Sequence, residues 1–493
     1  MIVGIDIGTQ SLKAVIVDQS MKVLAEAAYP YSPGFPQPGW AEQDPTLWEK
    51  GLRVAVASAL DNAGVASDEI RALGVAGQLD GCLPVDRDGR AMHNCLIWMD
   101  RRAERELTAV KGIDAESLRR ITGVTMDAGH MAAKIRWFLK NHSQTRQAAC
   151  FHQPVSYMVS RLTGAHVFDH ALASTSMLYS LKHGDYDTRL LEAFGLDRRQ
   201  LPEIKEAWDG AGEISSAGAE FSGLPQGLPV AVGTGDDYAT PLGAGIIEPG
   251  QMACVLGTAE VVGALDPNPK IDDQGLVETH RYFGGSYFIE NPGWLSGGAL
   301  EWFVETFRLD GVEEMVSLAE TAPAGCEGLL FLPALSGAMA PEWVESARGC
   351  FYGLTPAHGT AHLARAVLES CAFAMRDVLE RLRSMEVPVR SILLLGGGAR
   401  SRLWAQIRAD VSGAPVAVPL RLDTSPLGAA MLAAVAANIQ PSLKSCAMLV
   451  SDPESKDAVK KVMAPDPARH KIYEAAYIAY GRLFKSLRPM FIS

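Results

Sequence analysis

Two adjacent carboxylates follow a glycine turn near the middle of the chain. An apolar run at residues 230–232 leads into Gly-Thr-Gly at 233–235, and Asp236 and Asp237 come next. A strand that ends in such a turn presents the following side chains at an edge of its sheet. Carboxylates in that position can accept a proton or bind a cation, whereas a surface loop is the plain alternative.

Two other turns place glycine beside threonine. Residues 4–11 read G-I-D-I-G-T-Q-S, and residues 256–258 read L-G-T. Glycine has no Cβ, so backbone N–H groups and a threonine hydroxyl can approach an anion at such a turn. Two phosphate-type turns with a carboxylate pair between them favour phosphoryl transfer.

The elements that must position these turns repeat along the chain. A hairpin is predicted around each Gly-Thr turn, with strands at 2–7 and 14–17 and again at 252–256 and 261–264. Further strands are predicted at 72–76 and 392–395, an amphipathic helix at 402–411 and a terminal helix at 471–487. This pattern predicts an α/β fold of two domains, residues 1–246 and 247–493, with a boundary near 245–250.

Length and composition agree with a large enzyme. A chain of 493 residues with 48% hydrophobic content exceeds the usual size of one core. The net charge of −12 argues against nucleic acid or a membrane as the main partner. The eight cysteines form no C-x-x-C pair, so neither a disulfide framework nor a zinc site is predicted. We expect a cytoplasmic protein, since no apolar run is long enough to span a membrane.

Short motifs follow one another along most of the chain. In order they are G-I-D-I-G-T (4–9), A-E-Q-D-P (41–45), G-V-A-G-Q (74–78), W-M-D-x-R (98–102), A-K-x-x-W (133–137), G-T-G-D-D (233–237), L-G-T (256–258) and G-G-G-A-R-S (396–401). Together and in this order, they resemble the motifs of the FGGY carbohydrate kinases, the xylulokinases in particular. The resemblance implies two ribonuclease-H-like domains of the actin and hexokinase type, with a cleft between them. It also implies that MgATP donates its γ-phosphoryl group to a hydroxyl of a ketose, D-xylulose first.

The resemblance assigns the catalytic and nucleotide-binding roles. Asp236 is implied as the general base, and Asp6 with Asp236 as the Mg²⁺ site; helix N-capping is the alternative for Asp236. ATP contacts are implied for Gly8, Thr9, Gln10, Lys13, Gly257, Thr258, Gly297, Glu301, Gly397, Gly398 and Ser401. Lys13 can equally be a solvated strand residue, and Gly297 and Glu301 can belong to a tight loop before a packed helix.

The implied substrate pocket departs from the xylulokinase pattern. Its residues are Gln78, Leu79, Asp80, Trp98, Asp100 and Asp237. Asp80 and Asp237 stand where xylulokinases carry His and Asn, so hydrogen-bond acceptors replace donors. Glycerol kinases carry an acidic residue in the place of Asp80. Trp98 can form a flat wall for a carbon chain or belong to a core. Residues 336–341 (S-G-A-M-A-P) also replace a family Gly-Glu-Arg-Thr-Pro segment.

Three functions therefore stay open. The first is a xylulokinase-like enzyme, and the second is a kinase for another ketose or polyol, such as ribulose or a glycerol-like polyol. The third is an actin-like ATPase without a small-molecule acceptor, against which the polar set Gln78, Asp80 and Trp98 argues. The expected partners are a sugar or polyol and ATP. A homodimer is among the assemblies that the sequence leaves open.

Overall fold

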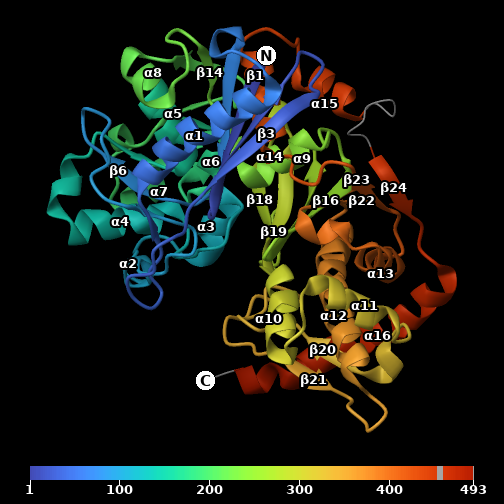
Figure 1. Cartoon of the computed structure of the whole chain (residues 1–493). Coiled ribbons are helices and arrows are strands. Elements are labelled where there is room, and N and C mark those ends of the chain that lie inside the picture. The colour runs from blue at the N-terminus through green and yellow to red at the C-terminus, as the bar shows by residue number, and fades with distance from the viewer. Residues whose placement is uncertain (452–458, 492–493) are drawn as a thin grey trace. The chain divides into compact units, whose positions relative to one another are not determined.

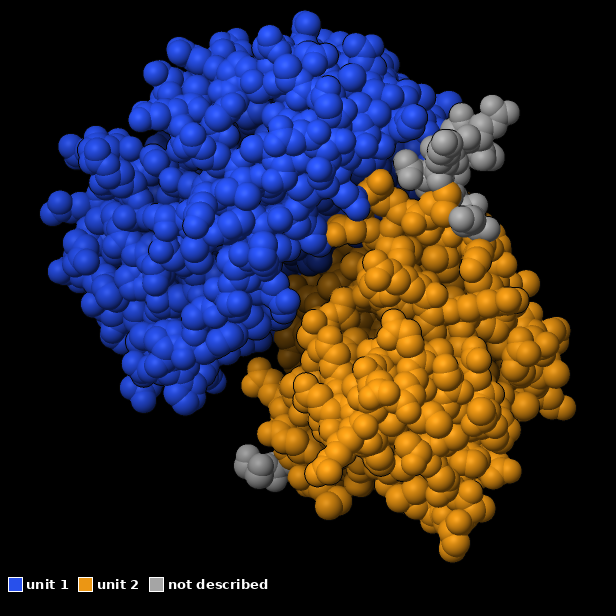
Figure 2. Space-filling view, in the orientation of Figure 1, with its two compact units in different colours: residues 1–247, 279–287, 424–455 blue, residues 248–278, 288–423, 456–493 orange. Residues whose placement is uncertain are grey.

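The computed structural model describes residues 1–451 and 459–491 and forms two compact α/β units (Figure 1). Unit 1 comprises residues 1–247, 279–287 and 424–455, and unit 2 comprises residues 248–278, 288–423 and 456–493, coloured separately in Figure 2. No helix in the described ranges is both long and apolar enough to cross a bilayer. The predicted division into two α/β units is present, and unit 1 also includes a late segment of the chain that begins at Thr424.

The sheet of unit 1 has the strand order β13-β14-β5-β1-β2-β3, with β15 also pairing with β5. These strands are β1 (Ile2–Ile7), β2 (Ser11–Val17), β3 (Val23–Pro30), β5 (Ala72–Gly77), β13 (Gly210–Glu213), β14 (Pro229–Ala231) and β15 (Thr234–Gly235). β1 and β2 form the predicted antiparallel hairpin, and β5 runs parallel to β1. Every residue of β1 and β5 is buried, as expected for strands that helices cover on both faces.

A helix from late in the chain packs on this first sheet. α14 (Ser425–Ala436) lies against β1, β5 and α9 (Asp236–Gly243). The approach depends on glycine, because a Cβ on Gly4 would lie 1.9 Å from the carbonyl oxygen of Pro426. A Cβ on Gly74 would be equally close to that of Ala429. These positions without a side chain let the helix pack closely on the sheet, so unit 1 also includes a segment from late in the chain.

Unit 2 repeats the hairpin and adds parallel strands. β16 (Gly250–Leu256) and β17 (Ala259–Asp266) are antiparallel around the second Gly-Thr turn, as predicted. β22 (Val389–Leu395) runs parallel to β16, and β23 (Val416–Pro419) runs parallel to β22. The predicted helices lie within α13 (Arg402–Ser412) and α16 (Pro467–Leu487), which pack beside α12 (Thr360–Ser384).

The remaining elements complete the two units. The other helices are α1 (Pro45–Ala63), α2 (Glu104–Thr108), α3 (Ala115–Thr122), α4 (Met131–Asn141), α5 (Pro154–Thr163), α6 (His170–Thr175), α7 (Thr188–Phe194), α8 (Ser216–Ser222), α10 (Gly297–Phe307), α11 (Val312–Glu320) and α15 (Leu443–Ser451). The other strands are β4 (Glu42–Gln43), β6 (Leu83–Val85), β7 (Cys95–Leu96), β8 (Cys150–His152), β9 (Val167–Asp169), β10 (Tyr179–Ser180), β11 (Asp185–Tyr186), β12 (Glu203–Lys205), β18 (Glu278–Arg281), β19 (Tyr287–Leu295), β20 (Leu330–Leu332), β21 (Cys350–Tyr352) and β24 (Val459–Met463).

Candidate active site

Three parallel strands of unit 1 end at one edge of the sheet. Ile7 at the end of β1 and Gly235 at the end of β15 both pair with Gly77 at the end of β5. The residues next to these ends, Asp6, Gln78 and Asp236, therefore meet although they are far apart in the sequence. Carboxyl ends of parallel strands are a frequent position for a binding site.

The turn before Asp236 admits glycine alone. Gly233 has a φ of +79°, and a Cβ there would lie 2.2 Å from the carbonyl oxygen of Val75. α9 begins at Asp236, and its N-cap is Gly235. The alternative in which Asp236 caps the helix is therefore not observed. Its position in the first turn places the carboxylate where the helix dipole favours negative charge.

Four carboxylates act on one another at this edge. Burial, and next the charge of Asp237, raises the pKa of Asp236. The pKa of Asp237 is also raised, first by burial and then by the charges of Asp80 and Asp6. Asp236 and Asp237 nevertheless keep part of their surface accessible to solvent. A carboxyl group with a raised pKa that a ligand can reach is suited to proton transfer near neutral pH.

The same carboxylates suit a hard divalent cation. Asp6 is almost completely buried at the end of β1, and Lys13 of β2 pairs opposite it. Lys13 is partly buried, and its positive charge offsets a small part of the rise in the pKa of Asp236. Oxygen donors with excess negative charge are the set that Mg²⁺ takes in proteins. The donor chemistry of Asp6, Asp236 and Asp237 thus fits that ion.

A chain of hydrogen bonds joins the first Gly-Thr turn to Gln78. Gln78 Nε2 donates to Gln43 Oε1 (2.6 Å), and Gln43 Nε2 donates to the carbonyl oxygen of Thr9 (2.5 Å). Trp98 Nε1 donates to Thr9 Oγ1 (3.0 Å). The turn itself is closed by Gly8 N–H, which donates to the carbonyl of Ser11. Gln43 lies within the A-E-Q-D-P motif, but the sequence did not predict that it links Thr9 to Gln78.

Trp98 and Asp100 differ in what they offer a ligand. The Trp98 side chain is 44% exposed, so the core alternative is excluded and an open aromatic face remains. Asp100 is fully buried; its carboxylate accepts from the backbone N–H of Ala41 (2.7 Å) and from Arg102 Nε (2.9 Å). Protein donors thus bind both Asp100 oxygens, and a substrate contact by this residue stays a prediction. Asp100 fixes the loop that carries Trp98.

Asp80 is held by residues to which the sequence assigned no role. Its backbone is left-handed, with φ +56°. Its N–H donates to Gln153 Oε1 (2.9 Å), and its carbonyl accepts from the buried Lys134 Nζ (2.6 Å). Its carboxylate Oδ1 lies 3.2 Å from His130 Nδ1. Lys134 also donates to the carbonyls of Ile97 (2.8 Å) and Gly129, and so ties three loops together.

Leu79 and Asp169 support the glycine turn at residues 233–235, which precedes Asp236. A Cβ on Gly235 would lie 1.8 Å from Leu79 Cδ2, so Leu79 packs directly under this turn. Thr234 Oγ1 donates to Asp169 Oδ2 (2.8 Å). Asp169 also caps α6 by accepting from the N–H groups of Ala171 and Leu172. Burial raises the pKa of Asp169 to about 7. Asp169 thus fixes the backbone two residues before Asp236.

In unit 2 the second Gly-Thr turn meets the start of α10. The carbonyl of Thr258 accepts from the N–H groups of Ser296 (3.1 Å) and Gly298 (3.0 Å). The carbonyl of Gly257 accepts from Gly297 N–H (3.2 Å), where a Cβ would lie 2.3 Å from that same oxygen. Gly297 is therefore both a tight-loop glycine and a neighbour of the exposed turn. Glu301 is exposed one turn further along α10.

The third glycine turn of unit 2 lies beside the second. Leu395 of β22 pairs with Val255 of β16, so the turns after these two strands are neighbours. Gly396 has a φ of +77°, and a Cβ there would lie 2.6 Å from the carbonyl oxygen of Leu256. Gly397 is exposed, and a Cβ on it would meet no atom within 4 Å. An open backbone surface of this kind can receive a flat ligand.

The last two residues of this predicted set have packing roles. A Cβ on Gly398 would lie 2.7 Å from the Trp404 ring, so the ring covers this glycine. Ser401 caps α13, because its hydroxyl accepts from Trp404 N–H (3.2 Å).

A buried ion pair supports the second turn and was not predicted. Arg408 donates to both carboxylate oxygens of Glu260, at 2.5 and 2.7 Å, and neither side chain has accessible surface. Glu260 also accepts from the Ser296 hydroxyl (2.7 Å) at the start of α10. Paired charges with these additional bonds are a stable way to bury a carboxylate. The pair fixes Ser296, whose N–H binds Thr258.

Comparisons with known proteins agree with this geometry. Residues 1–243 match the N-terminal domain, and residues 252–437 the C-terminal domain, of the FGGY family of carbohydrate kinases. A glycerol kinase of Thermococcus onnurineus is 31% identical over 487 residues, with 96% of this chain and 95% of that protein covered. A xylulose kinase of Escherichia coli is 30% identical, with 99% and 100% covered. The crystal structure of a xylulose kinase from Rhodospirillum rubrum superposes with a TM-score of 0.90 at 28% identity, and both chains are covered completely. This chain thus belongs to the FGGY family of carbohydrate kinases, as its motifs predict, and is a phosphotransferase with the two-domain fold of that family.

Proposed function

We propose that this enzyme transfers the γ-phosphoryl group of MgATP to a hydroxyl of a ketose, with D-xylulose as the first candidate. The observation that carries the proposal is Asp236, a ligand-accessible carboxylate with a raised pKa at the start of α9. The relatives named xylulose kinase and glycerol kinase give the two acceptor classes to compare. A polyol is the second candidate, because Asp80 supplies acceptors where the xylulokinase pattern has a donor.

The acceptor pocket in this proposal is formed by Gln78, Asp80, Trp98 and Asp237. The Asp80 carboxylate accepts hydrogen bonds from acceptor hydroxyls, and His130 fixes its orientation through Oδ1. The half-exposed Trp98 ring packs against the carbon chain. A pocket with several carboxylates selects hydroxyl donors, which ketoses and polyols both have in excess.

Asp236 takes the proton of the attacking hydroxyl. The proton moves from the hydroxyl oxygen to a carboxylate oxygen of Asp236, while that hydroxyl oxygen bonds to phosphorus and ADP leaves. The basic Lys13 lowers the pKa of Asp236 and so helps to keep the carboxylate ionised before transfer. General-base help of this kind contributes roughly 10²–10⁴-fold to the rate.

Nucleotide binding is proposed for two sets of residues. Gly8, Thr9 and Gln10, with Lys13, form the phosphate turn of unit 1. Unit 2 contributes Gly257, Thr258, Gly297, Glu301, Gly397, Gly398 and Ser401. Asp6 and Asp236 would hold Mg²⁺, which neutralises phosphate charge when bound. The capping role of Ser401 leaves its hydroxyl a second lone pair for a ligand.

The experiment is a panel of ketoses and polyols assayed for acceptor-dependent ADP formation. D-xylulose, ribulose and glycerol are compared with a blank without acceptor, which measures ATP hydrolysis alone. Asp236→Asn keeps the size of the side chain but cannot accept the proton, so kcat should fall at least about 100-fold while the fold persists. A blank rate equal to every acceptor rate would favour the ATPase alternative. Retention of more than about a tenth of wild-type kcat in the variant would refute Asp236 as the base.

A further inference from the structure

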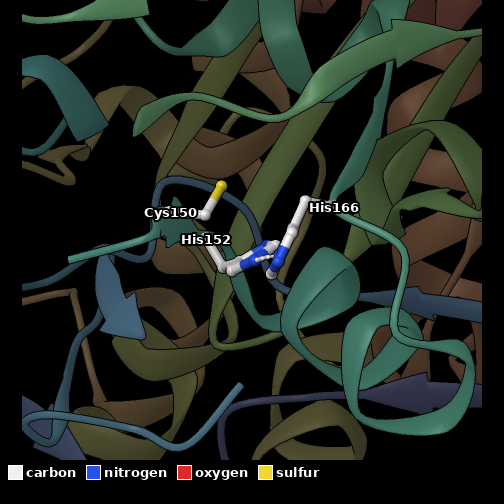
Figure 3. Close-up of side chains that lie close together, drawn as sticks. All are labelled: Cys150, His152 and His166. Carbon is white, nitrogen blue, oxygen red and sulfur yellow. Dashed lines mark hydrogen bonds between the residues drawn. The ribbon is translucent and has the colours of Figure 1, made fainter. Parts of the chain in front are cut away.

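Three metal-ligating side chains lie together in unit 1, outside the proposed active site. Cys150 and His152 stand two positions apart on β8, so both side chains point to the same side of that strand. His166 comes from the loop directly before β9. One ligand atom from each residue lies within 4.8 Å of the others. Figure 3 shows the rings of His152 and His166 beside each other, with the Cys150 side chain nearby. No zinc site was predicted from the sequence because it has no C-x-x-C motif. The cluster forms because folding brings His166 to His152, which lies 14 residues earlier in the chain.

The two ring nitrogens are closer together than the ligands of a tetrahedral zinc site. His152 Nε2 lies 2.8 Å from His166 Nδ1. Zinc binds nitrogen at about 2.0–2.1 Å and sulfur at about 2.3 Å, so its tetrahedral ligands stand roughly 3.3–3.6 Å apart. An ion between the rings thus requires the nitrogens to separate by about half an ångström. His166 can supply this movement, because it is only partly buried and precedes its strand, whereas His152 is fully buried.

The surroundings of His152 favour a ligand nitrogen that faces the cluster. The Ser156 hydroxyl lies 3.1 Å from the carbonyl of Gln153 and donates its single proton there. His152 Nδ1–H then donates to the Ser156 oxygen (2.9 Å), which leaves the lone pair of Nε2 directed at His166. A hydrogen bond on the far nitrogen is the usual support of a metal-bound histidine. Without a metal, the same lone pair accepts from His166 Nδ1–H, and this hydrogen bond is the competing explanation.

We propose that Cys150, His152 and His166 bind one thiophilic metal ion of the Zn²⁺ class, with the fourth coordination position open to water. A thiolate with two imidazoles suits zinc, whereas Mg²⁺ prefers oxygen. Binding breaks the His152–His166 hydrogen bond, forms two nitrogen–metal bonds and one sulfur–metal bond, and releases the thiol proton of Cys150 to solvent. His166 keeps one proton, which moves to its other ring nitrogen.

The site is connected to the proposed acceptor pocket on both sides. Gln153, the next residue after His152, accepts from the N–H of Asp80 (2.9 Å). The strand that follows His166 ends at Asp169, which accepts from Thr234 in the turn before Asp236. A metal that moves His166 therefore acts on two elements that position active-site residues. This consequence depends on the proposed function, but the metal site itself does not.

The test uses the whole protein, stripped of metal by a chelator and free of nucleotide. Zn²⁺ is titrated against it in excess Mg²⁺, which occupies oxygen sites, and we expect one tight equivalent per chain. His166→Ala and Cys150→Ser should each weaken that equivalent at least about 100-fold, since even the loss of a second-sphere partner costs about 10–100-fold. Co²⁺ in place of Zn²⁺ should give a thiolate-to-cobalt charge-transfer band that Cys150→Ser removes.

Two controls separate this site from adventitious binding. His358 and His362 lie near each other in unit 2, with ring centroids 5.3 Å apart, so His358→Ala/His362→Ala removes a competing histidine pair. Cys350→Ser removes a thiol that is not in the cluster. Neither control should change the tight equivalent. Circular dichroism of each variant shows that the fold is intact. Absence of a tight Zn²⁺ equivalent in the wild type, or its survival in both cluster variants, would overturn the proposal.

Discussion

Replacing Asp80 with asparagine removes one negative charge from the proposed acceptor pocket and leaves the backbone in place. Asp80 has a left-handed backbone, which asparagine tolerates better than alanine. Its N–H and carbonyl stay bound to Gln153 and Lys134, whatever the side chain. Asp80→Asn is therefore a cleaner test than Asp80→Ala, which adds backbone strain of about 1–2 kcal/mol.

The size of the effect follows from the orientation of the carboxylate. Oδ1 faces His130, so Oδ2 is the oxygen left for an acceptor hydroxyl. In the asparagine variant an amide nitrogen takes the place of Oδ2, because the remaining oxygen keeps His130 as its partner. One hydrogen bond to a charged group, about 1.5–3 kcal/mol, is lost. We expect kcat/KM for the acceptor to fall about 10- to 150-fold, while the KM for ATP stays unchanged.

Steady-state kinetics with each substrate varied in turn measure both parameters. Asp88→Asn is the matched control, because it removes the same charge from an exposed turn where Asp88 pairs with Arg90. The control should match the wild type in both parameters. Equal losses for acceptor and ATP would point to damaged folding, and an unchanged kcat/KM for the acceptor would refute the placement of Asp80 in its pocket.

Three further predictions concern pH, the nucleotide and motion. The pKa of Asp169 is raised to about 7, so the folded state holds a proton that the unfolded chain releases from about pH 4 upward. Stability from this group is fully present at low pH and falls as the pH rises toward 7; Asp169→Asn should flatten that fall, on the order of a few kcal/mol, in denaturant melts at pH 4 to 8. Gly397→Ala should raise the KM for ATP with an unchanged melting temperature, whereas Gly396→Ala should lower the melting temperature, because only Gly396 has a positive φ and a blocked Cβ position. Transfer needs the reacting atoms about 3–3.5 Å apart, so we expect the protein to become more compact when both ligands bind. Small-angle scattering with the acceptor and a non-hydrolysable nucleotide should then give a smaller radius of gyration, and a constant radius would refute this expectation.

Local sequence signals predicted the hairpins and turns because those structures depend on neighbours in the chain. The turn at Gly233 needs a positive φ and a missing Cβ, and both requirements appear in the sequence as glycine. The strands beside these turns have either alternating apolar residues or a continuous apolar run, and both patterns are typical of buried strands. The roles of Asp6, Gln78 and Asp236 came from the resemblance to the FGGY kinases, because these residues are far apart in the sequence.

The roles of the residues that hold the site in place were missed because these residues act across long stretches of chain. Gln153 reaches Asp80 across 73 residues, Lys134 reaches it across 54, and Thr234 reaches Asp169 across 65. A buried lysine or aspartate has no local signature that separates it from a solvated one. The return of α14 to unit 1 was missed similarly, since its uniformly apolar composition shows burial but not against which sheet.

The packing of α14 on the sheet of unit 1 affects how the protein folds during its synthesis. The ribosome releases β1 and β5 early, but the helix that covers one of their faces is encoded about 180 residues after residue 247, where the first segment of unit 1 ends. At about 5–20 residues per second the nascent chain waits roughly 10–35 s with that glycine-lined apolar face uncovered. Unit 1 therefore cannot complete its folding as an N-terminal domain, and its exposed face is a natural substrate for chaperones until residue 436 has emerged.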